Sequence, residues 1–271
     1  MASGLLPLVR LAKTEIVTSR LGFGTARLHY LAPRERQALL AAAAELGVVH
    51  FDSAPAYGDG IAETELGRFA ASERDRFVIA TKYGIPADPL VEAMPMLAFP
   101  VHAVRAMARR AGRWSPQLLP ITAAGLRKSA ERSLRRMRTD RIDILFLHEP
   151  NPQRLLHVEE ILEELCRLQR TGLIRAFGLA GGWSGVDALR TAAPALAQIM
   201  QTAEGEWPPE FPPEISYGAI SPGAQNYFAA RIDPVTATER LRSALERRPR
   251  GVVLISTTKR DHLRCLAEQA R

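Results

Sequence analysis

The sequence contains 271 residues, of which 46% are apolar and 24% charged, with a formal net charge of +7. This composition is typical of a globular chain that buries a large core without a disulfide or metal, and it excludes an intrinsically disordered protein. No run of about 18 apolar residues occurs, so we expect neither a membrane span nor a membrane partner. Residues 1–13 have no basic start followed by a long apolar stretch, so we also expect no secretory signal. Two distant cysteines, Cys166 and Cys265, without a metal-binding motif indicate a cytoplasmic, metal-free protein.

The positive charge raises the question of nucleic-acid binding. Basic residues are interleaved with acidic ones, and the densest groups are Arg135, Arg136 and Arg138, and Arg247, Arg248 and Arg250. Such runs usually form solvated helix faces. We therefore predict no nucleic-acid partner.

Short apolar runs recur along the chain and predict eight strands. The runs span residues 21–25, 48–51, 76–80, 142–147, 174–179, 196–200, 215–220 and 251–256. Their apolar residues are continuous rather than alternating, which is typical of parallel strands covered on both faces.

Helical patterns lie between these runs. They span residues 33–46, 122–138 and 153–171, and another begins near Thr236, which forms a capping box with Glu239. Thr122 is the predicted cap of the second helix. Alternating strands and helices predict a single (β/α)₈ TIM barrel over residues 1–271.

A doubly wound open sheet is the alternative fold. It is disfavoured because Gly22 and Gly24 lack the third glycine of a dinucleotide-binding turn, and because no helix follows directly.

Two proline-rich stretches interrupt the alternation. Residues 84–121 form a long insertion after the third strand, with a predicted helix near 101–111. Residues 205–213 stand where the sixth helix belongs, so that helix is predicted to be shortened or missing. The insertion is interpreted either as a lid over the active site or as a surface excursion.

Ionisable residues end three successive predicted strands. Asp52, Lys82 and His148 each follow an apolar run, and Tyr57 lies five residues after Asp52. Parallel barrels build their active sites at the carboxyl ends of the strands, so we expect these four side chains to meet there. Each residue alone has a structural interpretation, as a turn cap, a rim salt bridge, a loop aromatic or a core histidine. Their joint arrangement favours a site.

This group suits proton donation to a carbonyl oxygen. The pKa of a free tyrosine is near 10, and a neighbouring ammonium lowers it. A carboxylate keeps that ammonium charged, and a histidine can orient the carbonyl. We therefore interpret Tyr57 as a general acid supported by Asp52, Lys82 and His148. Carbonyl reduction also needs a hydride source, which indicates a nicotinamide cofactor.

The sequence resembles the aldo-keto reductases along most of its length. The resembling segments are residues 21–25, 51–58, 63–67, 80–82, 133–134, 140–148, 172–178 and 255–263. The resemblance implies a (β/α)₈ barrel that binds NADPH in an extended pose without a Rossmann motif. It assigns Tyr57 as the acid and Asp52, Lys82 and His148 as its supports.

The same resemblance implies a set of cofactor-binding residues. These are Gly24, Thr25, Asp52, Gln201, Ser221, Ser256, Thr257, Lys259, Arg260 and His262. A cation at a helix start suits a 2′-phosphate, which favours NADPH, with NADH as the alternative. Six positions depart from the family pattern. Ala180 and Gly181 replace a Ser-Asn pair that holds the nicotinamide carboxamide, and Ile220 replaces a stacking tyrosine. His262 stands where arginine is common, and Cys265 and Leu266 replace a Glu-Asn pair.

Two functions are compatible with these patterns. The first is NADPH-dependent reduction of a small-molecule aldehyde or ketone, or oxidation of the alcohol or sugar. The second is a catalytically weak barrel of the same fold that senses a cofactor or binds a partner, which the altered nicotinamide grip and the proline-rich insertion favour.

Overall fold

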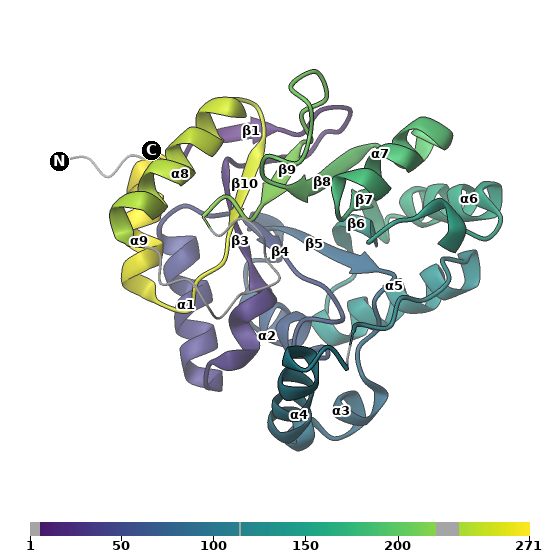
Figure 1. Cartoon of the computed structure of the whole chain (residues 1–271), viewed down its shortest axis with the longest axis horizontal. Helices are drawn as coiled ribbons and strands as arrows, with labels where there is room; N and C mark the ends of the chain where they lie inside the picture. The colour runs from purple at the N-terminus through teal and green to yellow at the C-terminus, as the bar shows by residue number, and fades with distance from the viewer. Residues whose placement is uncertain (1–5, 114, 221–232) are drawn as a thin grey trace.

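A computed structural model describes residues 6–113, 115–220 and 233–271 as a closed barrel of eight parallel strands (Figure 1). The predicted (β/α)₈ fold is confirmed, and each of the eight apolar runs contributes a strand. In barrel order the strands are β3 (Leu21–Gly24), β4 (His50–Asp52), β5 (Val78–Tyr83), β6 (Ile142–His148), β7 (Ile174–Ala180), β8 (Ile199–Ala203), β9 (Ile215–Tyr217) and β10 (Val252–Ile255), which pairs with β3.

Helices surround the barrel and cover the outer faces of its strands. They are α1 (Pro33–Glu45), α2 (Ile61–Ala70), α5 (Ala123–Met137), α6 (Val158–Arg170), α7 (Trp183–Ala192), α8 (Pro234–Arg247) and α9 (Arg260–Gln269). Thr122 caps α5 as predicted, because its side chain accepts a hydrogen bond from the Gly125 amide. The cap predicted at Thr236 is wrong. Asp233 caps α8 and accepts from the Thr236 amide, because Pro234 can occupy the first helical turn.

Both predicted interruptions of the strand–helix alternation are confirmed: the insertion after the third strand, and the absence of the sixth helix. Residues 84–121 contain α3 (Pro89–Ala93) and α4 (Ala98–Arg110), which lie beside α2 at the edge of the molecule (Figure 1). Residues 204–214 contain no helix. Trp207 lies in this loop, and the guanidinium of Arg248 stacks 4.3 Å from its ring centroid. The helices of the described ranges include none that is long and apolar enough to cross a bilayer.

The prediction that both arginine clusters are solvated is wrong for one member of each. Arg136 forms a 2.7 Å ion pair with the fully buried Glu63. Arg248 is 3% exposed and lies 3.3 Å from the carboxylate of Glu204. Acidic partners distant in sequence neutralise these arginines, and a local charge pattern does not reveal such partners.

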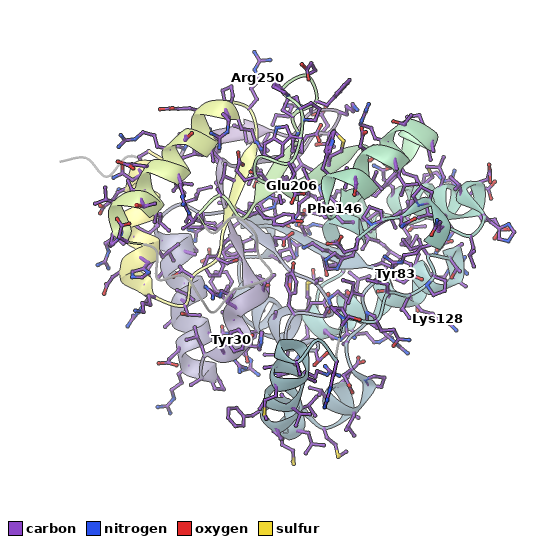
Figure 2. The ribbon with its side chains drawn as sticks, in the orientation of Figure 1. Tyr30, Tyr83, Lys128, Phe146, Glu206 and Arg250 are labelled. Carbon is purple, nitrogen blue, oxygen red and sulfur yellow. The ribbon has the colours of Figure 1, made fainter. Side chains whose placement is uncertain are left out.

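Two apolar layers form the core. The outer layer lies between strands and helices, and the inner layer fills the barrel with residues such as Ile144, Phe146 and Val252. Figure 2 shows Phe146 within the barrel, whereas Lys128 and Arg250 lie at the periphery.

A hairpin that we did not predict closes the amino-terminal end of the barrel. It consists of β1 (Leu8–Arg10) and β2 (Val17–Ser19), which pair in antiparallel fashion. Leu11 and Ile16, in its turn, are fully buried against the inner layer. The hairpin strands are only three residues long, too short to give a periodic signal.

The register of the barrel gathers the ends of the strands. Asp52 pairs with Ala80, Lys82 with Phe146, and His148 with Ala180. Because side chains alternate between the two faces of a strand, Lys82 shares the inner face with Ala80, and His148 shares it with Phe146. The inward ionisable residue thus shifts by two positions from each strand to the next, as the stagger of a closed barrel requires.

His50, on the inner face one step below Asp52, makes stability sensitive to acid. It is fully buried, and its Nε2 has no hydrogen-bond partner among the described residues. Burial lowers the pKa of His50 to about 4 from an ordinary 6.5. Between these values the unfolded chain binds more protons, so stability should fall as the pH drops from about 6.5 towards 4, by roughly 3 kcal/mol for this residue.

The His50→Leu variant should therefore lose less stability over this pH interval than the parent protein. The measurement is urea unfolding at pH 7 and at pH 4.5, and the comparison is between the two differences, because the substitution also changes absolute stability. Leucine at the exposed His262 is the control for a histidine-to-leucine change at the surface. An equal response in the His50 variant would contradict the assignment.

Candidate active site

A buried ion pair lies at the carboxyl ends of β4 and β5. The ammonium of Lys82 donates to Asp52 Oδ1 at 2.6 Å and to the Ser53 carbonyl at 2.9 Å. Both side chains are almost fully buried. Burial lowers the pKa of Lys82, and the attraction and hydrogen bond of Asp52 oppose this change. The end of β5 thus carries a cation, and one carboxylate and one backbone carbonyl hold it in position.

Tyr57 lies over this cation. It follows a tight turn in which its amide donates to the Ala54 carbonyl at 3.0 Å. The ring is half-buried, and its centroid is 5.0 Å from the Lys82 ammonium. At this distance the cation interacts favourably with the ring. The structure therefore places Tyr57 and Lys82 next to each other, as the sequence predicted.

His148 completes the group from the end of β6. Its ring meets that of Tyr57 edge to face, with centroids 6.3 Å apart at an angle of 86°. Burial holds the pKa of His148 well below its usual value, and the charges of Lys82 and Arg154 lower it further. The imidazole is thus neutral at physiological pH. Its Nδ1 is buried without a hydrogen-bond partner in the described structure.

The residues predicted to bind a cofactor from β3 and β10 lie on one rim of the barrel. Ser256 Oγ donates to the Gly24 carbonyl at 2.8 Å. Thr25 Oγ1 donates to the Asp52 carbonyl at 3.0 Å. Both hydroxyls thus fasten neighbouring strand ends, and the rim is braced around Asp52.

The residues predicted to hold a phosphate group gather at the start of α9. Thr257 Oγ1 accepts a hydrogen bond from the Lys259 amide at 3.1 Å, which shapes the turn into the helix. Lys259, Arg260 and His262 are exposed there. Helix starts and cations both attract anions. Ser221, which was also predicted to bind the cofactor, lies outside the described residues.

Glu149 is a residue of the site that the sequence did not reveal. It follows His148 with a φ of +47°, and its carboxylate accepts from the Gly182 amide at 3.3 Å. A side chain at Gly181 would place its Cβ 2.9 Å from Glu149 Oε2. The carboxylate thus occupies the space beside Gly181, and burial raises its pKa. The glycine that departs from the family pattern at position 181 thus leaves room for the Glu149 carboxylate.

Asp59 was also missed, and it ties the Tyr57 loop to the insertion. Its Oδ2 accepts hydrogen bonds from His102 Nε2 and Arg105 Nη1 of α4, both at 2.8 Å, and its Oδ1 accepts from the Asp88 amide at 2.8 Å. We call these contacts the Asp59 clamp. Asp59 has a φ of +53°, between Gly58 at +62° and Gly60 at +90°. Three successive left-handed residues form an unusual turn that the clamp supports.

Several buried polar atoms at the strand ends lack partners among the described residues. They include Asp52 Oδ2, His148 Nδ1 and Gln201 Oε1, and Gln201 pairs with Ala180 on the neighbouring strand. Unpaired buried polar groups are costly, so their concentration here indicates a polar ligand. A carboxamide, which offers both donors and an acceptor, fits this chemistry. No cluster of three or more metal-binding side chains occurs in the described parts of the chain.

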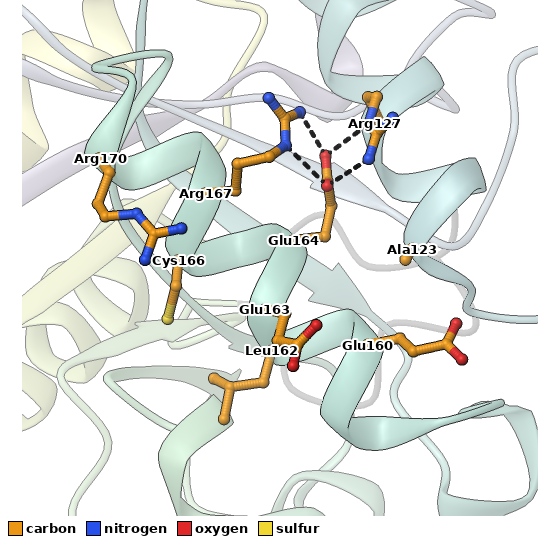
Figure 3. Close-up of a pocket in the computed structure, with 9 residues that line it drawn as sticks. All are labelled: Ala123, Arg127, Glu160, Leu162, Glu163, Glu164, Cys166, Arg167 and Arg170. Atoms are coloured by element: carbon orange, nitrogen blue, oxygen red, sulfur yellow. Dashed lines mark hydrogen bonds and ion pairs between the residues drawn. The ribbon is translucent and has the colours of Figure 1, made fainter.

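A hollow of about 730 Å³ lies elsewhere, on the outside of the barrel between α5 and α6 (Figure 3). Its centre is Glu164, which receives paired hydrogen bonds from Arg127 and Arg167 at 2.6–2.9 Å. These bonds lower the pKa of Glu164 to about 2, and the hydrogen bond from Arg167 makes the largest contribution. The charges compensate one another, and no strand end lines the hollow, so we assign it a packing role.

Comparison with known proteins identifies the family. The sequence profile of the Aldo/keto reductase family matches residues 20–201. The chain belongs to this family. Among curated aldo-keto reductase relatives, it is 32% identical over 178 residues to a D-threo-aldose 1-dehydrogenase from a Pseudomonas species, covering 64% of this chain and 52% of the relative. It is 32% identical over 151 residues to a 6-dehydroglucose reductase from Agrobacterium fabrum, covering 55% and 44%.

Solved structures share the fold over nearly the whole chain. An aldo-keto reductase from Bacillus halodurans in its holo form has a TM-score of 0.72 at 17% identity, covering 97% of this chain and 90% of that one. One from Klebsiella pneumoniae in complex with NADPH has a TM-score of 0.67 at 20% identity, covering 98% and 90%. The alignments with the two curated relatives span only about half the length of each.

The Asp59→Ala substitution should loosen the insertion. It removes the carboxylate that accepts hydrogen bonds from His102 and Arg105 of α4 and from the Asp88 amide, so we expect a loss of about 2–3 kcal/mol in the free energy of unfolding. Hydrogen exchange should also lose protection within residues 98–110. Urea unfolding and exchange mass spectrometry measure the two effects.

The Asp261→Ala variant is the control, because the Asp261 side chain is almost fully exposed and lies 3.9 Å from its partner, Arg264. It should leave both measurements unchanged. Unaltered protection of residues 98–110 in the Asp59 variant would show that the clamp does not hold α4.

Proposed function

We propose that this protein reduces an aldehyde or ketone, or oxidises the corresponding alcohol or sugar, with NADPH as cofactor and Tyr57 as general acid. The observation that carries the proposal is the position of the Lys82 ammonium, paired with Asp52 and 5.0 Å from the Tyr57 ring centroid. A cation beside a phenol favours its ionised form, so Tyr57 can give up a proton more readily at neutral pH.

The other residues of the site have distinct tasks in this proposal. Asp52 holds Lys82 charged and in place, because an unpaired ammonium at this depth would be strongly disfavoured. The neutral His148, edge-on to Tyr57, is suited to orient a carbonyl oxygen by a hydrogen bond from its ring without competing as an acid. In this proposal Tyr57 delivers one proton to the carbonyl oxygen, and His148 holds that oxygen in position.

The cofactor supplies the hydride when it is bound. Gln201 and the unpaired polar atoms around it suit a carboxamide, and the exposed Lys259 and Arg260 at the start of α9 suit a 2′-phosphate. Glu149 adds a carboxylate acceptor near the missing side chain of Gly181. Relatives named as an aldose dehydrogenase and a dehydroglucose reductase support a sugar or a similar polyol as substrate.

The Tyr57→Phe substitution tests the role of the phenol. Turnover of an aldehyde and aldose panel with NADPH should fall at least about 100-fold, because general acid catalysis contributes on this scale. Binding of NADPH, measured by fluorescence titration, should stay unchanged. Tyr30→Phe is the matched control, since Tyr30 is a half-exposed tyrosine outside the group, and it should keep full activity.

Two other results would change the conclusion. Full turnover in the Tyr57 variant would exclude this tyrosine as the acid. Binding of NADPH by the parent protein without turnover on any substrate of the panel would favour the alternative, a catalytically weak cofactor-sensing barrel, which the departures at Ala180 and Gly181 support.

Cofactor choice gives an independent prediction. Replacing Lys259 and Arg260 together with alanine should raise the Kd for NADPH about tenfold or more and leave the Kd for NADH nearly unchanged, because only NADPH carries the additional phosphate. Fluorescence titration with each cofactor measures the difference. An equal loss for both cofactors would assign these two residues a general role instead.

A further inference from the structure

Helix α4 is oriented with its polar side toward the protein. His102 and Arg105, one turn apart, both bind Asp59, and Arg105 also pairs with Asp88. These contacts fix the rotation of the helix about its axis. A surface helix of a globular protein normally shows the opposite arrangement, with its apolar side inward.

The outward side of this segment carries large apolar residues. Phe99 is 84% exposed, Val104 66% and Met107 71%, and Met96, just before the helix, is 84% exposed. Phe99 and Met107 are eight residues apart and therefore lie on one face. The segment lies at the edge of the molecule, away from the barrel (Figure 1). We call these four residues the α4 ridge.

The ridge lies in a stretch of the chain that has no negative charge. Between Glu92 and Ala123, where α5 begins, the sequence contains no acidic residue, but it contains arginine at positions 105, 109, 110 and 113. Arg105 is bound within the clamp, whereas Arg113, just beyond the helix, is exposed. By sequence, the segment that carries the ridge is thus cationic, and the whole chain has a net charge of +7.

We propose that the α4 ridge binds an anionic lipid surface. Protruding aromatic and thioether side chains next to arginines match the pattern of helices that lie in the headgroup region of a membrane, with their apolar side inserted and their cations near lipid phosphates. The helix needs only shallow insertion, so no membrane span is involved. The proposal replaces the expectation, drawn from the absence of a span, that the protein has no membrane partner.

A second copy of the chain fits the ridge less well. Pairing two such ridges would bring together two stretches without an acidic residue to neutralise the arginines, and like charges across an interface oppose association. A protruding helix also suits a flat, deformable surface better than a groove. The Asp59 clamp holds the ridge outward, so its exposure follows from specific contacts.

Vesicle co-sedimentation tests the proposal with the full chain. The protein should bind vesicles of equal parts phosphatidylglycerol and phosphatidylcholine, but not vesicles of phosphatidylcholine alone, and binding should weaken as salt rises from 0.05 to 0.5 M. The Phe99→Ser, Met107→Ser double variant should lower the partition coefficient at least about tenfold, because both apolar side chains would lose their burial in lipid.

A matched pair of variants separates the ridge from general surface hydrophobicity. Val104 on α4 and Val235 on α8 are each 66% exposed. Val104→Ser should weaken vesicle binding, and Val235→Ser should not. Equal effects of the two substitutions, or no binding to anionic vesicles by the parent protein, would overturn the proposal.

Light scattering after size-exclusion chromatography tests whether a second copy of the chain binds the ridge instead. A dimer that the Phe99→Ser, Met107→Ser variant dissociates, without vesicle binding by the parent, would assign the ridge to a second copy and overturn the lipid proposal. Carbonyl reduction in solution should be equal in all four proteins, since none of the substituted residues belongs to the proposed active site. A failed activity assay therefore leaves the vesicle result interpretable.

Discussion

The contact between the Lys82 ammonium and the Asp52 carboxylate is the interaction on which the site depends. Two opposite charges placed within the barrel tolerate removal from water only when they are paired and hydrogen-bonded. The pair has a 2.6 Å contact and a second acceptor in the Ser53 carbonyl. Thr25 and Ser256 brace the surrounding strand ends, and Tyr57 covers the cation. The rim of the barrel is thus arranged around one charge.

Much of this arrangement was predictable from the sequence, for physical reasons. Strands of a parallel barrel are buried on both sides, so each appears as a continuous apolar run, and an ionisable residue at the end of such a run stands out. Asp52, Lys82 and His148 were found in this way. The barrel stagger, which no single strand encodes, then brings them to one place.

Other features depend on contacts between distant segments and were not predictable. Glu149 belongs to the site because of a left-handed backbone and the bare Gly181 beside it, and neither gives a sequence pattern. Asp59 has its partners 43 and 46 residues further along the chain. Arg136 and Arg248 were assigned to solvent because their runs look polar, but Glu63 and Glu204 draw them inward. The rotation of α4 likewise follows from the Asp59 clamp, since its sequence alone would favour turning the apolar side inward.

The hairpin of β1 and β2 completes the packing of the barrel interior. Leu11 and Ile16 join the apolar layer formed by Ile144, Phe146 and Val252, at the amino-terminal end. The barrel is therefore a filled core rather than a pore. The carboxyl rim, where Lys82 lies, is the end of the barrel left for a ligand.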